Sequence, residues 1–292
     1  MRLILAAAAA LAAGAVIAQP APPPPAPAAG FTNSQACFAR FTAIGMPVVR
    51  AESQREEEVA PMCRRGYAFG WNGVTRNPDW VMEHLSKADL TGAAQRPSGG
   101  FKPDTELLGP KAVKPSEYDK TNFDRGHQAP AGDDKFDQAV MNDSFFMSNM
   151  APQVGSGFNR GEWKYLEEQV RAWVLCGGHD EIYVITGPIY GPAAAHFMTG
   201  PNTLADHKIR VPDGFYKIVF DPQTRRAVGF VLDNKAVKKV AFDGFITPIA
   251  DIEDRTGLDF FPSLNQHDQN LIEANKGELW GHAQACTGSQ TD

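Results

Sequence analysis

Residues 122 to 130, NFDRGHQAP, place an acid, a base, a glycine and a histidine side by side. The side chain with the clearest chemistry is His127, which follows a strand-like segment and lies on a turn between Gly126 and Pro130. An imidazole with a pKa of about 6.5 is largely neutral at neutral pH and can take a proton from water. His127 is therefore a candidate general base. A structural or surface histidine is the alternative.

A second group of polar residues lies in MSNMAPQVGSGFNRGEW, residues 147 to 163. Asn159 precedes a helical stretch and could simply cap it, because Glu162 stands at the spacing of a capping box. A strand, loop and helix that follow a histidine-bearing strand also let the histidine face a ligand on the helix across a gap the size of a metal ion. Both interpretations of Asn159 stay open at this point.

Four motifs in this order resemble the DNA/RNA non-specific endonuclease family, the ββα-metal or His-Me finger nucleases that include endonuclease G. They are DRGHQAPAG, SNMAPQ, FNRGEWKYLE and YVITGPIY, which begin at residues 124, 148, 158 and 183. The resemblance covers roughly residues 65 to 260, and several ordered motifs are more specific than one. It implies a metal-dependent endonuclease that hydrolyses phosphodiester bonds in DNA and RNA.

The resemblance also implies roles for three residues. His127 matches the general base, Asn159 matches the single direct protein ligand of Mg²⁺, and Glu167 matches a carboxylate that reaches the ion through water. Mg²⁺ prefers hard oxygen ligands and keeps most of its water, so one direct ligand and one carboxylate that acts through water are sufficient to bind it. Mn²⁺ is the alternative ion. A cation there and the histidine together suit phosphodiester hydrolysis.

Two arginines complete the implied site. Arg96, in QRPSGG, matches a catalytic arginine that clamps the substrate phosphate, as guanidinium geometry favours. Arg125 belongs to the signature with Asp124, and both are expected to place the phosphate or the histidine strand, with a structural role as the alternative.

Phe145 stands where some relatives carry asparagine, which leaves open what orients His127. Asn149 could bind a water or end its strand. Contacts to the phosphate backbone carry no base information, so little sequence preference is expected.

Short strands are the elements that must position these residues. Runs of aromatic and β-branched residues bounded by Gly, Pro, Asn or Asp predict strands. These runs are 67 to 71, 79 to 85, 144 to 149, 181 to 187, 215 to 220 and 227 to 232. Few helices separate them, so the sheet is expected to be mostly antiparallel.

Two helices are predicted. After Asn159, an apolar stripe recurs at steps of three and four, as expected of a helix that packs on a sheet. The stripe consists of Trp163, Leu166, Val170 and Trp173. A second helix is expected from Thr247 as the cap, through Pro248, to Gly257 as the stop. The predicted fold class is α+β, with a ββα-metal motif, a mostly antiparallel sheet and a long central helix.

The N-terminal residues predict export. Residues 1 to 18 are an apolar run after Arg2 that resembles a cleaved signal peptide, with an uncleaved membrane anchor as the alternative. Residues 19 to 30 are a proline- and alanine-rich linker, and residues 31 to 292 are expected to form a single nuclease domain. The expected location is periplasmic or secreted, without stable membrane association after cleavage. A homodimer is left open.

Four cysteines, Cys37, Cys63, Cys176 and Cys286, without metal-type spacing favour two disulfides in an exported protein. Of the three possible connectivities we favour Cys37 with Cys63 and Cys176 with Cys286, and four free thiols are the alternative.

Charge and motifs narrow the function. The net charge of −6 argues against bulk electrostatic binding of nucleic acid, but it does not exclude a polyanionic substrate in a locally positive cleft. VGSGF lacks the first glycine of a nucleophile elbow, and no HExxH motif occurs. The alternative from another class is a catalytically silent, exported module that binds nucleic acid or the cell envelope on the same fold.

Overall fold

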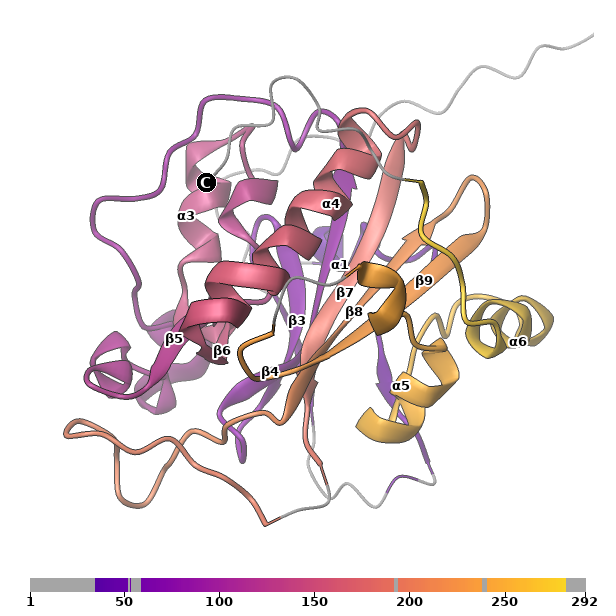
Figure 1. The fold of residues 1–292 in the computed structure, drawn as a ribbon. Helices are drawn as coiled ribbons and strands as arrows, with labels where there is room; N and C mark the ends of the chain where they lie inside the picture. The colour runs from indigo at the N-terminus through magenta and orange to yellow at the C-terminus, as the bar shows by residue number, and fades with distance from the viewer. Residues whose placement is uncertain (1–34, 52, 54–58, 192–193, 238–240, 282–292) are drawn as a thin grey trace, which may run out of the picture.

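A six-stranded antiparallel sheet forms the centre of the computed structural model, which describes residues 35–51, 53, 59–191, 194–237 and 241–281 (Figure 1). Its strand order is β2-β3-β4-β7-β8-β9. The strands are β2 (Ala60–Cys63), β3 (Tyr67–Asn72), β4 (Asn77–Ser86), β7 (Glu181–Ile189), β8 (Gly214–Asp221) and β9 (Arg226–Asp233). This arrangement confirms the predicted antiparallel sheet.

Both faces of the sheet are covered, because side chains along each strand alternate between two hydrophobic clusters. In β8, Tyr216 and Ile218 belong to one cluster, while Phe215 and Val219 belong to the other. The first cluster includes residues of α1 (Gln35–Ala39) and α5 (Ile249–Thr256), and α6 (Gln266–Ala274) packs against it. The second includes α4 (Trp163–Leu175), which crosses the opposite face (Figure 1).

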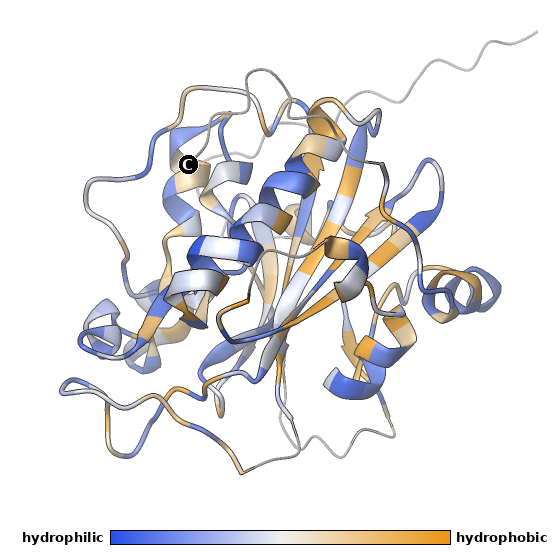
Figure 2. Cartoon of the chain, in the orientation of Figure 1, coloured by the Kyte–Doolittle hydropathy of each residue, from blue (hydrophilic) through white to orange (hydrophobic). Residues whose placement is uncertain are grey.

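Helix α4 is the predicted central helix. All four residues of its apolar stripe are buried and belong to the second cluster, as the spacing predicted. The strands are mainly hydrophobic, whereas the outer sides of α4 and α6 carry hydrophilic residues (Figure 2). Burial of the stripe therefore fixes which face of α4 points away from the sheet.

The ββα unit lies beside this sheet. β5 (Phe123–His127) pairs antiparallel with β6 (Met150–Val154), with His127 opposite Met150. Between the two strands lie α3 (Gln138–Ser144) and two 3-10 turns, Ala131–Asp133 and Met147–Asn149. An irregular turn, Gly155–Glu162, then leads from β6 into α4. The sequence motifs thus lie on a strand pair and the helix that follows it.

Smaller elements complete the described chain. They are β1 (Val48–Val49), which pairs with β10 (Leu258–Asp259), the short helix α2 (Thr105–Leu108), and the 3-10 turns Gly109–Lys111, Pro115–Tyr118 and Phe242–Phe245. Within the described residues, no helix is both long and apolar enough to cross a membrane.

One predicted strand is wrong. Residues 144 to 149 contain the end of α3 and a 3-10 turn rather than a strand. The carboxylate of Asp137 caps the start of α3 by accepting from two backbone N–H groups. The aromatic residues that suggested a strand are used elsewhere: Phe145 contacts His127, and Phe146 lies beneath two cations.

Two predicted helix caps also differ. The N-cap of α4 is Glu162, and the Asn159 side chain donates to Asp124, so the capping box that was one of its two open interpretations does not form. Pro248 takes the N-cap position of α5 in place of Thr247. The predicted stop is confirmed, since Gly257 has the left-handed backbone that glycine adopts without strain (φ 68°).

The predicted Cys37–Cys63 disulfide is present and spans a sequence separation of 26. A loop of this size is worth about 3 to 4 kcal/mol in the loop-entropy picture. Cys176 is also disulfide-bonded, but its predicted partner, Cys286, lies outside the described residues. The predicted signal peptide (1 to 18) and linker (19 to 30) lie outside them as well.

Candidate active site

One polar cavity of about 530 Å³ collects every residue to which the sequence assigned a role in catalysis, substrate binding or metal binding. It is lined by Arg96, Phe101, Phe123, Asp124, Arg125, His127, Pro130, Ala131, Asn159, Arg160, Lys164 and Glu167. These residues come from the loop after β4, from β5 and its following turn, and from the turn before α4 and α4 itself. The ββα unit is therefore what brings them together.

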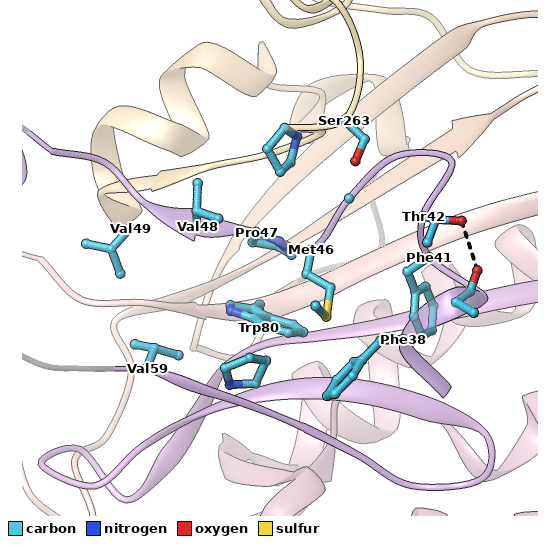
Figure 3. Close-up of a pocket in the computed structure, with 14 residues that line it drawn as sticks. Phe38, Phe41, Thr42, Met46, Pro47, Val48, Val49, Val59, Trp80 and Ser263 are labelled. Carbon is cyan, nitrogen blue, oxygen red and sulfur yellow. Dashed lines mark hydrogen bonds between the residues drawn. The ribbon is translucent and has the colours of Figure 1, made fainter. Parts of the chain in front are cut away.

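A second cavity, of about 650 Å³, has a different character. Figure 3 shows apolar side chains such as Phe38, Met46 and Trp80 around it. None of the described residues that line it is titratable. It therefore offers no side chain for acid-base chemistry, and the polar cavity is the candidate active site.

His127 contacts two aromatic rings that also contact each other. The Phe145 ring is nearly perpendicular to the imidazole at a centroid distance of 5.0 Å, and Phe101 lies at 5.5 Å. These contacts answer the question of what orients the ring. Gly126 is needed just before it, because a Cβ there would lie 2.2 Å from the side chain of Gln153.

The surroundings of His127 favour its neutral form. Burial lowers the pKa of the imidazole to about 3, and the positive charge of Arg96 acts in the same direction. The Nε2 atom is buried and has no hydrogen-bond partner among the described residues. At neutral pH the ring is therefore in the unprotonated form that a general base requires, with a nitrogen that is not hydrogen-bonded within the described protein.

Asn159 is oriented by its neighbours. Its Nδ2 donates to Oδ2 of Asp124 at 2.8 Å, and the same carboxylate accepts from Nη1 of Arg160, with a distance of 2.6 Å to Oδ1. Because the amide nitrogen is used in this way, the amide oxygen is the atom of Asn159 that could bind a cation. With Glu167 lining the same cavity, the oxygen donors fit a hard cation such as Mg²⁺.

Beneath Glu167 lies a buried layer of charge between the sheet and α4. It contains Glu83 on β4 and Lys217 on β8, which are 2% and 1% exposed. Nζ of Lys217 donates to Oγ1 of Thr186 at 2.6 Å and lies 5.1 Å from the Trp163 ring. Burial lowers the pKa of Lys217, while the carboxylates of Glu167 and Glu83 oppose that effect. Lys217 thus lies where a positive charge would offset the carboxylates of Glu83 and Glu167 on the underside of the site.

The two predicted arginines differ in what they contact. Arg125 donates to the Pro115 carbonyl at 2.8 Å and to Asp119 at 2.7 Å, so its guanidinium fastens β5 to the preceding turn. Arg96 is exposed and lies 5.2 Å from the Phe145 ring. Arg96 is therefore better placed than Arg125 to meet a phosphate from solvent.

Asn149 is buried, and its side chain bonds to the loop that follows His127. Its Oδ1 accepts from the backbone N–H of Ala129, and its Nδ2 donates to the carbonyls of Ala129 and Ser144. The side chain is 0% exposed. These contacts give it a structural role that spans the turn after His127.

Sequence reasoning gave no role to several residues that line the cavity, among them Phe101, Arg160 and Lys164. A signal existed for two of them. Arg160 follows Asn159 directly in the FNRG motif. Lys164 precedes Glu167 by three residues, which places Lys164 and Glu167 on one face of α4. Phe101 comes from a loop without regular spacing and gave no such signal.

The chain matches the model of the DNA/RNA non-specific endonuclease family over residues 50–267. It is 36% identical over 211 residues to nuclease C1 of Cunninghamella echinulata var. echinulata, covering 69% of this chain and 82% of that protein. It is 33% identical over 216 residues to the mitochondrial nuclease of Saccharomyces cerevisiae, covering 69% of this chain and 65% of that protein. A crystal structure of the EndoG/EndoGI complex contains a chain with a TM-score of 0.65 and 27% identity, covering 78% of this chain and 94% of that chain.

The predicted periplasmic or secreted location is wrong on these comparisons. The relatives from Saccharomyces cerevisiae, Schizosaccharomyces pombe, mouse, human and Caenorhabditis elegans are named as mitochondrial nucleases. The prediction depended on an apolar N-terminal run and on cysteine pairing.

Proposed function

Because this chain belongs to the DNA/RNA non-specific endonuclease family, we propose that it is a Mg²⁺-dependent endonuclease that cleaves DNA and RNA without sequence preference. His127 acts as the general base, and Asn159 holds the ion directly, with Glu167 reaching it through water. We assign this activity to one domain spanning residues 31 to 292. Nucleases of this family are metal-dependent, typically on Mg²⁺, and Mn²⁺ is the alternative here.

The observation that carries the proposal is the pairing of His127 with Asn159 in one cavity. The imidazole is neutral, and its buried Nε2 has no described partner, so it can remove a proton from the attacking water. Asn159 has its amide nitrogen fixed by Asp124, which supports its amide oxygen as the ligand atom.

The other residues of the cavity act on charge. Arg96 is exposed at the cavity and can pair with the non-bridging oxygens of the scissile phosphate. A divalent ion at Asn159 would supply further positive charge to the phosphate and the leaving oxygen. Lys164 and Arg160 add positive charge around the cavity and suit contacts to the sugar-phosphate backbone, which would explain a lack of base specificity.

Digestion of several substrates tests the proposed function. Purified protein with Mg²⁺ is expected to nick supercoiled plasmid and to degrade single-stranded DNA and RNA, because the proposed contacts involve the backbone. Sequencing of the product ends should show no fixed motif. Binding of all three substrates without cleavage, in Mg²⁺ and in Mn²⁺, would favour the silent binding module instead.

A further inference from the structure

Three carboxylates lie together on the side of the sheet opposite to α4. They are Glu253 on α5, Asp259 on β10 and Glu273 on α6, and their ligand atoms all lie within 4.8 Å of one another. The two helices lie to one side of the sheet in Figure 1, whereas α4 crosses its other face. The cluster is therefore separate from the cavity that contains His127.

Two of these carboxylates are nearly inaccessible to water. Glu253 is 7% exposed and Glu273 is 8% exposed, so each is more than nine-tenths buried. Oε1 of Glu253 accepts the backbone N–H of Phe260 at 2.8 Å. Oε1 of Glu273 is buried and has no hydrogen-bond partner among the described residues. A buried carboxylate oxygen without a partner costs free energy unless something binds it.

Burial of Glu253 and Glu273 also changes their pKa values. Burial raises the pKa of Glu253 to about 7 and that of Glu273 to about 8, and the negative charge of Asp259 adds to both effects. The positive charge of Arg50 acts in the opposite direction on both groups, but burial outweighs it. The cluster therefore favours a bound positive charge, which is either a proton or a metal ion.

A metal ion accounts for the geometry better than a proton does. One added proton would neutralise a single carboxylate, whereas an ion can contact oxygens from all three elements. Oxygens that all lie within 4.8 Å of one another can contact one Ca²⁺ ion together, since each bond to Ca²⁺ is about 2.4 Å long. Ca²⁺ also tolerates irregular geometry and water in its remaining positions, whereas Mg²⁺ requires a near-ideal octahedron.

We propose that Glu253, Asp259 and Glu273 form a second divalent cation site, which binds Ca²⁺ and fastens α6 to α5 and β10. Such a site stabilises the fold and takes no part in proton transfer at His127. The proposal does not depend on nuclease activity, so it can hold or fail independently of the proposed function.

Calcium-dependent stability tests this site. The thermal unfolding midpoint is measured against CaCl₂, and separately against MgCl₂, in wild type and in the Asn159→Ala variant, which weakens binding at the active site. At 100-fold excess of Ca²⁺ over its Kd we expect a rise of roughly 5 to 10 °C in both proteins. Glu273→Gln, which has the shape of a protonated glutamate, should weaken Ca²⁺ binding at least about tenfold.

The matched control is Glu278→Gln, because the side chain of Glu278 is 87% exposed and it lies outside the cluster. This variant should keep the full response to Ca²⁺. If Glu273→Gln fails to fold, Asp259→Asn replaces it, since Asp259 is only half-buried. A wild type that does not respond to Ca²⁺, or a response that survives both cluster substitutions, would show that the carboxylates merely share protons and would overturn the proposal.

Discussion

Replacement of His127 by alanine is expected to lower the turnover number for plasmid cleavage at least about 100-fold, the low end of general-base contributions. The substitution removes the neutral imidazole from the cavity while the Phe101 and Phe145 rings that flank it remain. Steady-state cleavage rates and circular dichroism, measured on the same preparation, separate loss of the base from loss of the fold.

His267→Ala is the matched control, because this histidine is exposed on α6 and outside the cavity. It should retain full turnover. Since burial lowers the pKa of His127 to about 3, loss of its basic form should not reduce the wild-type rate as the pH falls through 6.5. Near-normal turnover of a folded His127→Ala protein would remove His127 from the role of base.

Replacement of Asn159 by alanine is expected to raise the Mg²⁺ concentration for half-maximal rate at least about tenfold, as loss of a ligand or its support typically does. The substitution removes the amide oxygen that we propose binds the ion. It also removes the hydrogen bond to Asp124 that fixes this amide. Cleavage rates measured across a Mg²⁺ titration report the change directly.

Asn270→Ala serves as the control, because Asn270 is exposed on α6 and does not line the cavity. Its Mg²⁺ dependence should match that of wild type. If Asn159→Ala shows an unchanged Mg²⁺ requirement, Asn159 does no more than support the turn between β6 and α4.

The central sheet and α4 could be predicted from local sequence because each obeys one simple period. The apolar stripe from Trp163 to Trp173 repeats at helical spacing, and strands such as β8 are short runs of aromatic and β-branched residues between turn residues. These segments are buried against the same sheet, so local preference and tertiary packing agree.

The segment around Phe145 could not be predicted in this way. Its aromatic residues fit a strand locally, yet they pack against His127 and against the cations of Arg64 and Lys102, which are distant in sequence. The capping role considered for Asn159 is absent for the same reason. Its side chain bonds to Asp124, which is 35 residues away in sequence. Contacts of this kind exist only once the chain has folded.

Ordered motifs predicted the residues of the cavity better than local structure did. DRGH and FNRG lie on β5 and on the turn before α4, so the ββα unit brings them to one cavity. The buried layer of Glu83 and Lys217 had no such signal, because neither residue belongs to a recognised motif and the two lie on separate strands. The carboxylate cluster of α5, β10 and α6 likewise depends on three separate elements meeting.

The most direct measurement is the initial rate of plasmid cleavage by chelator-treated protein, before and after Mg²⁺ is added. The oxygen donors at Asn159 and Glu167 suit Mg²⁺ or Mn²⁺ and are too few and too hard for zinc chemistry. We predict no cleavage in excess EDTA and full recovery when Mg²⁺ is restored. Full activity in excess EDTA would contradict a metal-dependent mechanism at this cavity.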